Sequence, residues 1–448
     1  MELIYNIHDR PSLDKVFLFA LQQLLAIIAA TIAVPAIVGH GLTASAALFG
    51  AGVGTIIYLL FTKSSSPVFL GSSFAFIGSM ISAFAGATSV TVGYWGLIIG
   101  AAMAGIVYVI IALVIKFCGV QWIGKLMPAV IIGPTVAIIG LSLAGNAVSN
   151  LTTASVQGGS TYVAVICGLV TLAVTMLCAT YGKRIGRLIP FILGIMAGYV
   201  TATIFALIGH AANIPSLIVI NYDALSALNF KSLSGYFTLP AFTFLLGGAE
   251  GLKGVTASYL LTIFAAYVPV AFVVFAEHLA DHKNLSAIIG TDLIENPGLT
   301  RTLLGDGVGT FVSTLFGGCP NTTYGESIGC VAITRNASTI SIWGCAILCI
   351  VFSMISPLVA FLETIPACVM GGVCIALYGF IAVSGFKMFQ YVDLNKNKNL
   401  FVASVIFITG VGGMVISFGK VEIRTVACAL ILGILTNLML GGEKADAE

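Results

Sequence analysis

The sequence predicts an all-α polytopic membrane protein. Only 8% of its 448 residues are Asp, Glu, Lys or Arg, against roughly 25% in an ordinary soluble domain. Apolar residues make up 59% of the chain and the mean hydropathy is +1.09, so polar surface is too scarce to cover a water-exposed globule of this size. These figures exclude a soluble enzyme. The net charge of +2, without any block of Lys or Arg, also excludes a nucleic-acid partner.

The ten cysteines indicate small buried hydrophobic residues, since most lie in apolar stretches and none forms a C-x-x-C pair. At the N-terminus, Asp9, Arg10 and Asp14 precede the first apolar stretch, and no clear small-residue cleavage site follows it. We therefore expect the first helix to be retained rather than removed as a signal peptide.

About fourteen apolar stretches are long enough to cross a bilayer, which needs about 20 residues per helix. Polar segments with Pro and Gly interrupt the third and tenth spans, at residues 63–73 (KSSSPVFLGSS) and 317–325 (GGCPNTTYG). These two spans and the twelfth are poor candidates for simple helices. The expected centres of the spans are residues 27, 52, 77, 103, 133, 171, 198, 268, 309, 328, 347, 371, 407 and 431.

The distribution of Lys and Arg supports this count, because cytoplasmic loops retain positive charge. With both termini in the cytoplasm, 15 of the 19 basic residues fall on the inside. Adding or removing a single early span would invert every later loop and destroy this segregation. The basic residues assigned to the outside are Lys231, Lys253, Lys420 and Arg424.

The spans divide into two halves of seven, so two similar halves would have to be inverted relative to each other. Residues 127–129 (MPA) resemble 365–367 (IPA), and residues 72–75 (SSFA) resemble 322–325 (TTYG), although chance similarity among Gly- and Ala-rich helices is the alternative. The expected boundaries are 1–15 for a cytoplasmic N-terminus, 16–209 for the first repeat, 210–254 for an extracellular connection, 255–440 for the second repeat and 441–448 for a cytoplasmic C-terminus.

Five carboxylates lie within or at the edge of apolar stretches, where an ionisable group is costly and marks a functional site by default. Glu277 and Asp281 are four residues apart and share one helix face, while Glu326 follows the second broken segment. No Lys or Arg lies deep in a span, so desolvation favours the protonated form of these three groups and predicts that they carry protons. For Asp306 and Glu363, close to the expected span ends, a structural hydrogen bond is the favoured interpretation.

The broken segments also predict a ligand site, because non-helical backbone within a membrane must line a cavity or be covered by protein. Such backbone presents free N–H and C=O groups. Phe74 and Tyr324 occupy equivalent points of the two segments and offer aromatic faces to a flat ring, although a Phe in a membrane helix commonly contacts lipid or core.

Two motifs suggest other chemistry and are weaker. Residues 325–329 (GESIG) fit the G-x-S-x-G pattern of serine hydrolases, but the strand, turn and helix of an α/β sheet are absent around Ser327. His278 and His282 have the spacing of a zinc-binding helix, but the Glu of H-E-x-x-H and a third ligand are missing. We expect no metal site and no cofactor, and interpret the two histidines as residues at a polar membrane border.

Several motifs match a known family. They are Leu21-Gln22-Gln23 with Val34-Pro35, Gly71-Ser72-Ser73-Phe74-Ala75-Phe76, Ala276-Glu277-His278, Asn296-Pro297-Gly298-Leu299, Pro320-Asn321-Thr322-Thr323-Tyr324-Gly325-Glu326 with Ala332-Ile333-Thr334-Arg335, and Val369-Met370-Gly371-Gly372. On these residues the chain resembles the nucleobase-ascorbate transporter family across essentially its whole length, and is most similar to the family's bacterial uracil permeases.

The resemblance implies a homodimer of 14-span protomers, built as two inverted repeats with core and gate domains, that takes up uracil together with protons across the cytoplasmic membrane. Spans three and ten would begin as short strands. Substrate-binding residues would be Glu277, Glu326, Phe74, Tyr324, Gly325 and Ser73, and proton-coupling residues would be Glu277, Asp281 and Glu326.

The chain departs from the family pattern at two positions. Asp281 stands where many uracil permeases have His, and Ser327 stands where the family commonly has Asn. A xanthine or urate symporter of the same family is the alternative function. An anion exchanger of the same architecture would require a basic residue near the broken spans, and none is evident. A serine hydrolase predicts loss of function in Ser327→Ala, whereas a transporter predicts a mild change.

Overall fold

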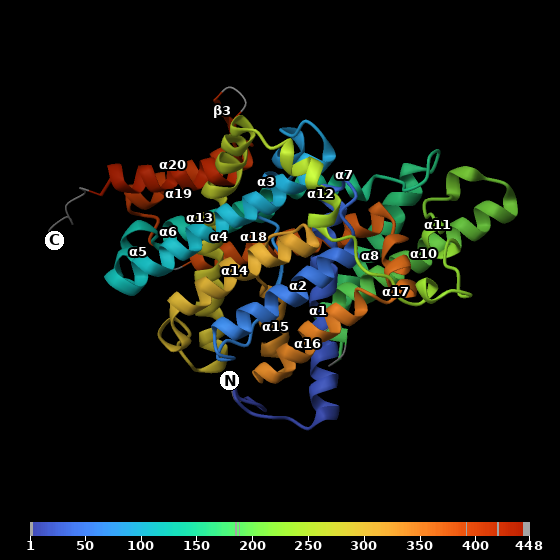
Figure 1. Cartoon of the computed structure of the whole chain (residues 1–448), viewed down its shortest axis with the longest axis horizontal. Coiled ribbons are helices and arrows are strands. Elements are labelled where there is room, and N and C mark those ends of the chain that lie inside the picture. The colour runs from blue at the N-terminus through green and yellow to red at the C-terminus, as the bar shows by residue number, and fades with distance from the viewer. Residues whose placement is uncertain (1–2, 184–185, 188, 391, 419–420, 442–448) are drawn as a thin grey trace.

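The computed structural model describes residues 3–183, 186–187, 189–390, 392–418 and 421–441, most of which are helical (Figure 1). Within this part of the chain, eight helices are long and apolar enough to cross a membrane, and three apolar helices are shorter. The long helices are α1 (Leu13–Val38), α2 (Ala44–Phe61), α4 (Val90–Cys118), the continuous pair α6 (Ala129–Ser142) and α7 (Ala144–Leu151), α8 (Thr161–Tyr181), α10 (Pro190–Ala212), α13 (Ala257–Ile289) and α18 (Ala367–Phe389). The shorter ones are α16 (Thr339–Phe352), α19 (Asn397–Val411) and α20 (Thr425–Met439).

The third and tenth spans are broken, and each consists of a short strand followed by a helix. β1 (Leu70–Ser72) leads to α3 (Ile77–Ala85), and β2 (Asn321–Thr323) leads to α15 (Gly325–Thr334). The strands pair antiparallel, with Gly71 opposite Thr322. Pro320, just before β2, has no N–H and cannot continue the helix that precedes it. The pairing satisfies backbone groups that would otherwise be unpaired within the membrane.

The twelfth span is an uninterrupted helix, and the expectation of a poor helix there is wrong. α18 is 23 residues long, and Pro366 occupies its N-cap position. The missing N–H of a proline costs nothing at the start of a helix, where the first N–H groups have no intrahelical acceptor. The proline therefore starts the helix rather than breaking it.

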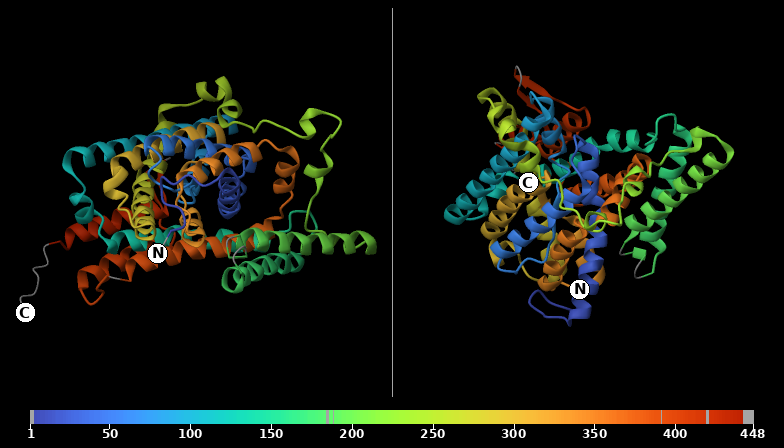
Figure 2. Two further views of the ribbon diagram at one scale, coloured as in Figure 1. Left: turned by 90° about the horizontal axis from the view of Figure 1, so that it is seen from below. Right: turned by 45° about the vertical axis from the view of Figure 1, so that its right-hand side comes forward.

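The helices pack in two groups that meet around the paired strands. The first group contains α1 to α4, α13, α14 (Leu299–Gly317), α15 and α16, and the second contains α6 to α8, α10 and α18 to α20. Close packing within each group depends on glycine: a Cβ at Gly50 of α2 would lie 2.6 Å from the Ser313 carbonyl oxygen of α14. Helices of the second group lie along the lower edge of the left-hand view in Figure 2, in orange-red and green.

The remaining elements are short and connect the long helices. They are α5 (Gln121–Leu126), α11 (Asp223–Ser226), α12 (Thr243–Lys253), α17 (Ser356–Glu363), the turns Pro215–Leu217, Leu233–Gly235 and Ile294–Gly298, and the hairpin of β3 (Ile416–Phe418) and β4 (Val421–Ile423). Of the sequence predictions, Lys420 and all but residue 441 of the C-terminal segment 441–448 lie outside the described residues.

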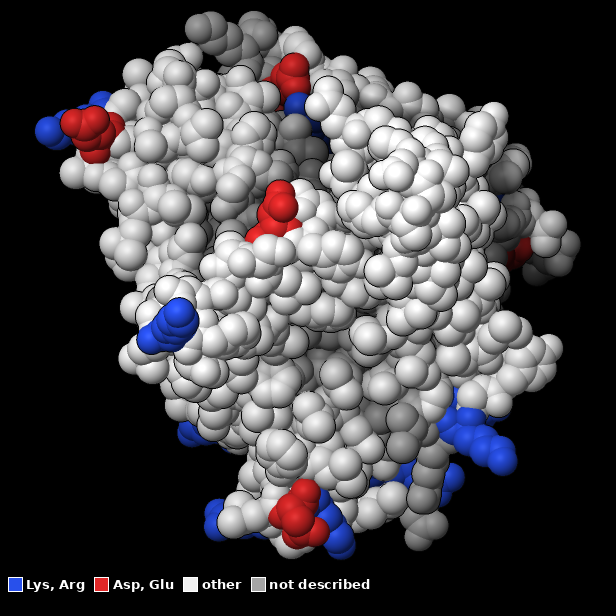
Figure 3. All heavy atoms as spheres, turned by 90° about the vertical axis from the view of Figure 1, so that its right-hand side faces the viewer, with Lys and Arg blue, Asp and Glu red and all other residues white. Residues whose placement is uncertain are grey.

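The face of the molecule shown in Figure 3 is mostly uncharged, as is expected of a surface that faces lipid. On the face shown in Figure 3, side chains of Lys and Arg gather mainly along the lower edge, and most of the remaining area carries no charge. α8 and α10 expose many large apolar side chains, among them Leu169, Leu177, Val200, Ile204 and Leu207.

Candidate functional site

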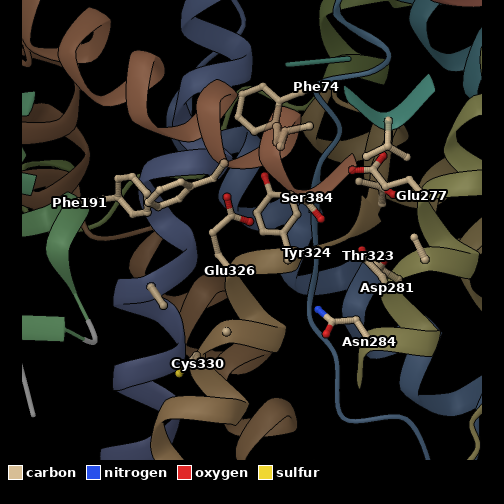
Figure 4. Close-up of a pocket in the computed structure, with 18 of the residues that line it drawn as sticks. Phe74, Phe191, Glu277, Asp281, Asn284, Thr323, Tyr324, Glu326, Cys330 and Ser384 are labelled. Carbon is tan, nitrogen blue, oxygen red and sulfur yellow. Dashed lines mark hydrogen bonds between the residues drawn. The ribbon is translucent and has the colours of Figure 1, made fainter. Parts of the chain in front are cut away.

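A cavity of about 400 Å³ lies between the two helix groups, beside the paired strands. In Figure 4, the side chains of Glu277 and Glu326 stand on opposite sides of this cavity, with Phe74 above. We call it the carboxylate cavity. Its wall includes Phe74, Val136, Arg187, Phe191, Glu277, Asp281, Thr322, Thr323, Tyr324, Gly325, Glu326 and Ser384.

Three carboxylates predicted from the sequence share this wall. Glu277 and Asp281 lie on one face of α13, and Glu326 lies in the first turn of α15. The Asp281 carboxylate accepts a hydrogen bond of 2.6 Å from Thr323 Oγ1. None of the Lys and Arg residues in the described chain forms an ion pair with these three groups. The cavity thus concentrates acidic groups without a bonded counter-ion.

Two polar atoms on the wall are buried and have no partner in the described chain. They are Oε2 of Glu277 and Oγ1 of Thr322. A buried polar atom without a hydrogen bond costs about 1–3 kcal/mol, so such atoms are normally paired. Glu277 and Thr322 thus retain unused hydrogen-bonding capacity beside the cavity.

Tyr324 supplies a flat aromatic wall that the strands hold in place. Its hydroxyl donates to the carbonyl oxygen of Ser72 at 2.9 Å, and its backbone N–H donates to the carbonyl oxygen of Phe69 at 3.2 Å. The ring lies over Gly71, where a Cβ would overlap the ring carbons. Gly71 of β1 is therefore required for the ring of Tyr324, which directly follows β2, to lie where it does.

The start of α15 adds hydrogen-bond donors to the cavity. The first intrahelical bond runs from the N–H of Ile328 to the carbonyl oxygen of Tyr324. The N–H groups of residues 325–327 therefore have no acceptor within the helix. Gly325 is exposed on the wall, and no atom lies within 4 Å of a Cβ placed there. Free N–H groups at a helix start attract the carbonyl oxygen or negative charge of a ligand.

Ser73 and Phe74 differ in their relation to the cavity. Phe74 lies on the wall, and its ring meets that of Tyr378 edge-on, with centroids 5.5 Å apart. Ser73 is fully buried and is absent from the wall, and its N–H donates to the carbonyl oxygen of Pro320 at 2.8 Å. Of the six residues predicted to bind a substrate, Ser73 is the one that the structure places away from the cavity.

A buried pair behind the cavity escaped the sequence analysis. His278 Nδ1 lies 2.7 Å from Asp306 Oδ2, and both side chains are 0% exposed. His282 Nε2 lies 2.8 Å from the hydroxyl of Tyr58 and is equally enclosed. Both histidines are therefore enclosed by protein, and Asp306 lies within α14 rather than at its end. The described residues contain no cluster of His, Cys, Asp and Glu that could hold a metal.

Arg187 and several residues of the second helix group were also missed. Arg187 lines the cavity, and its guanidinium donates to the carbonyl oxygen of Thr180 at 3.1 Å. Phe191 of α10 and Ser384 of α18 complete the wall opposite the strands. Phe191 and Ser384 lie in apolar helices, where a residue looks the same in sequence whether it faces lipid or a cavity.

Ser327 joins three segments of the first helix group. Its Oγ accepts a hydrogen bond of 2.9 Å from the N–H of Phe69 and another from Nε2 of Gln23 on α1. The side chain is fully buried, and neither His278 nor His282 is among its partners. The hydroxyl thus fixes the segment before β1 against the helix that carries Glu326.

Ser327→Ala is therefore expected to do more than the mild change inferred from the sequence. The N–H of Phe69 loses its acceptor, whereas Nε2 of Gln23 keeps the backbone carbonyl oxygen of Ser327 at 3.2 Å. The loss costs about 1–3 kcal/mol, so the thermal unfolding midpoint should fall and transport should drop about tenfold. Ser327→Thr, which keeps the hydroxyl, should retain more of both. Thr334→Ala on the same helix removes only a local bond to the Cys330 carbonyl oxygen and is the control. An unfolding midpoint of Ser327→Ala equal to that of Thr334→Ala would contradict this role.

Comparison with known proteins shows extensive similarity in sequence. Residues 14–418 match the model of a family described as Permease family (Xan_ur_permease). The chain is 38% identical to the uracil permease of Bacillus caldolyticus, over 99% of this chain and 96% of that protein. It is 33% identical to the uracil permease of Escherichia coli (strain K12), over 97% of this chain and 93% of that protein.

Comparison with solved structures identifies proteins that share this fold. The transmembrane domain of a cyanobacterium bicarbonate transporter, BicA, is similar with a TM-score of 0.64 and 14% identity, over 97% of this chain and all of that one. The overall structure of SLC26A9 is similar with a TM-score of 0.64 and 13% identity, over 95% of this chain and 64% of that one. At such identities the similarity shows a shared fold alone.

Proposed function

The chain belongs to the Permease family (Xan_ur_permease), which makes it a membrane transporter and not an enzyme, and we propose that it takes up uracil together with protons. The observation that carries this proposal is the carboxylate cavity. Uracil is flat and uncharged, and it carries N–H donors and C=O acceptors on alternating edges. Glu277 and Glu326 accept its N–H groups, the N–H groups at the start of α15 donate to a carbonyl oxygen, and the rings of Phe74 and Tyr324 border the base.

Proton coupling follows from the crowding of the carboxylates. Negative charges on Glu277, Asp281 and Glu326 repel one another in a cavity without a bonded counter-ion. Binding of the base is therefore unfavourable while these carboxylates are ionised. Protons that enter from outside neutralise the site and favour binding of the base. Loss of the protons to the cytoplasm restores the repulsion and favours release. The difference in affinity between the two states couples the two fluxes.

The movement is a rocking of the second helix group, as a gate, against the first, as a core. This proposal includes fourteen spans in two inverted repeats of seven, with boundaries at residues 15, 209, 254 and 440, and both termini in the cytoplasm of a plasma-membrane homodimer. Support comes from the inverted pairing of β1 with β2 and from the packing of the helices in two groups.

Uptake into proteoliposomes tests the proposal. With an acidic exterior, radiolabelled uracil should accumulate, and a protonophore should abolish the accumulation. Unlabelled uracil at a hundred times its dissociation constant should stabilise the purified protein by about 2.7 kcal/mol. Accumulation of radiolabelled xanthine without accumulation of uracil would instead identify the purine symporter, and accumulation of radiolabelled bicarbonate would identify an anion exchanger.

A further inference from the structure

A second cavity, of about 250 Å³, lies between the same two helix groups. α3 and α13 of the first group line one side of it, and α6, α7 and α20 of the second group line the other. The lining residues used below are Phe74, Val270, Ile139, Arg424 and Ala427.

Two helices independently place the two cavities in series. On α13, Val270 lines the second cavity and Glu277 lines the carboxylate cavity, and seven residues of helix correspond to about 10 Å along its axis. On α6, Ile139 lines the second cavity and Val136 lines the carboxylate cavity. Phe74 is the one described residue that lines both. Its side chain therefore stands between two compartments of one passage.

The barrier at Phe74 is formed across the two helix groups. The residue is only 7% exposed, and its ring, from the first group, packs edge-on against that of Tyr378 on α18 of the second group. The passage is therefore blocked by a contact that must separate when the two groups move apart.

Arg424 makes a second connection between the groups, on the far side of Phe74. It precedes α20, and its Nε donates a hydrogen bond to Oγ of Ser82 on α3. A Cβ at Gly78 would lie 3.4 Å from Cδ of Arg424, so the side chain lies along α3. Its Nη2 is 3.4 Å from the carboxylate of Glu422 in β4, and the Arg424 side chain is 34% exposed.

We propose that the second cavity is the outer vestibule of the uracil path, that Phe74 closes it toward the carboxylate cavity, and that Arg424 holds it shut through Ser82. The outward orientation of the vestibule rests on the proposed function. The closure by Phe74 and Arg424 does not depend on it. Arg424 is thus a positioning residue that sets the balance between two access states. Loss of its hydrogen bond shifts that balance toward the state in which the vestibule is open.

Thiol labelling of a buried reporter tests the closure without any substrate. Ala427→Cys lies on the wall of the vestibule and Ala427 is 1% exposed, so a maleimide reaches it only when the vestibule opens. Ala429→Cys, on the same helix, is equally enclosed but is not on the wall. The background is Cys118→Ser with Cys178→Ser, because the other eight cysteines are buried. Purified protein in detergent exposes both sides, so orientation does not enter.

Arg424→Ala and Ser82→Ala should each raise the labelling rate of Cys at 427 by about 10- to 150-fold, as expected for loss of one hydrogen bond to a charged group. The rate at 429 should not change. Parental rates at 427 in both variants would overturn the proposal, and so would equal increases at 427 and 429, which would indicate general loosening. Increased labelling at 427 in a protein that fails to transport uracil would support the closure and refute the proposed function instead.

Discussion

Glu326→Gln and Glu277→Ala are each expected to abolish proton-driven accumulation of uracil. Glu326→Gln places an amide donor where the base presents an N–H, and Glu277→Ala removes an acceptor whose Oε2 has no partner in the described chain. The loss of one such bond weakens binding by about 30- to 150-fold, or ~2 to 3 kcal/mol. Uptake into proteoliposomes and equilibrium binding of radiolabelled uracil measure the two effects separately.

Stability distinguishes loss of a ligand contact from misfolding. Glu277 is a carboxylate without a bonded counter-ion, so its removal should leave the unfolding midpoint unchanged or raised. Glu363→Gln is the matched control, because Glu363 is exposed at the end of α17 and is absent from the cavity wall.

Asp281→Asn should keep uracil exchange between the two sides of the membrane while reducing proton-driven accumulation of uracil. Normal accumulation in Glu326→Gln and Glu277→Ala together would refute the assignment of the site.

Gly71→Ala should be the most damaging single-methyl change in the site. A Cβ at this position overlaps ring carbons of Tyr324, so the ring has to leave β1 and its hydroxyl loses the carbonyl oxygen of Ser72. Overpacking of this kind costs about 1–3 kcal/mol. The displaced ring also enters the space for the base, and we expect uracil affinity to fall at least about tenfold. Titration of radiolabelled uracil and a thermal unfolding scan measure both effects.

A second glycine provides the control for this substitution. No atom lies within 4 Å of a Cβ placed at Gly379 in α18, and alanine is the better helix former by about 1 kcal/mol. Gly379→Ala should therefore bind uracil normally and unfold at the same or a higher temperature. If Gly71→Ala binds uracil as tightly as Gly379→Ala, the Tyr324 ring is not a wall of the binding site.

The sequence predicted the broken spans and the acidic cluster because both are visible locally. Pro320 and the polar residues after it cannot continue a membrane helix, and a carboxylate such as Glu326 stands out in an apolar stretch. The His278 and Asp306 pair was missed because its members lie 28 residues apart on different helices. The absence of Ser73 from the cavity wall was equally invisible, because the backbone turns after β1 and no pattern shows which way the next side chain points.

The sequence pattern also did not reveal which residues of the second helix group line the cavity. Phe191 and Ser384 lie in helices that are apolar all round, and such helices give no periodicity to separate a cavity face from a lipid face. The twelfth span was misjudged for a related reason, since the effect of Pro366 depends on whether it stands before or within the helix. Both errors concern tertiary packing rather than local propensity.

The pairing of β1 with β2 makes the order of synthesis important for assembly. The bond from Tyr324 to Ser72 joins residues 252 positions apart, so β1 enters the membrane long before its partner strand exists. Until then its N–H and C=O groups need water or another temporary partner. The first half of the chain therefore cannot complete the site alone, and the ribosome has to deliver β2 before the newly inserted protein can hold a base.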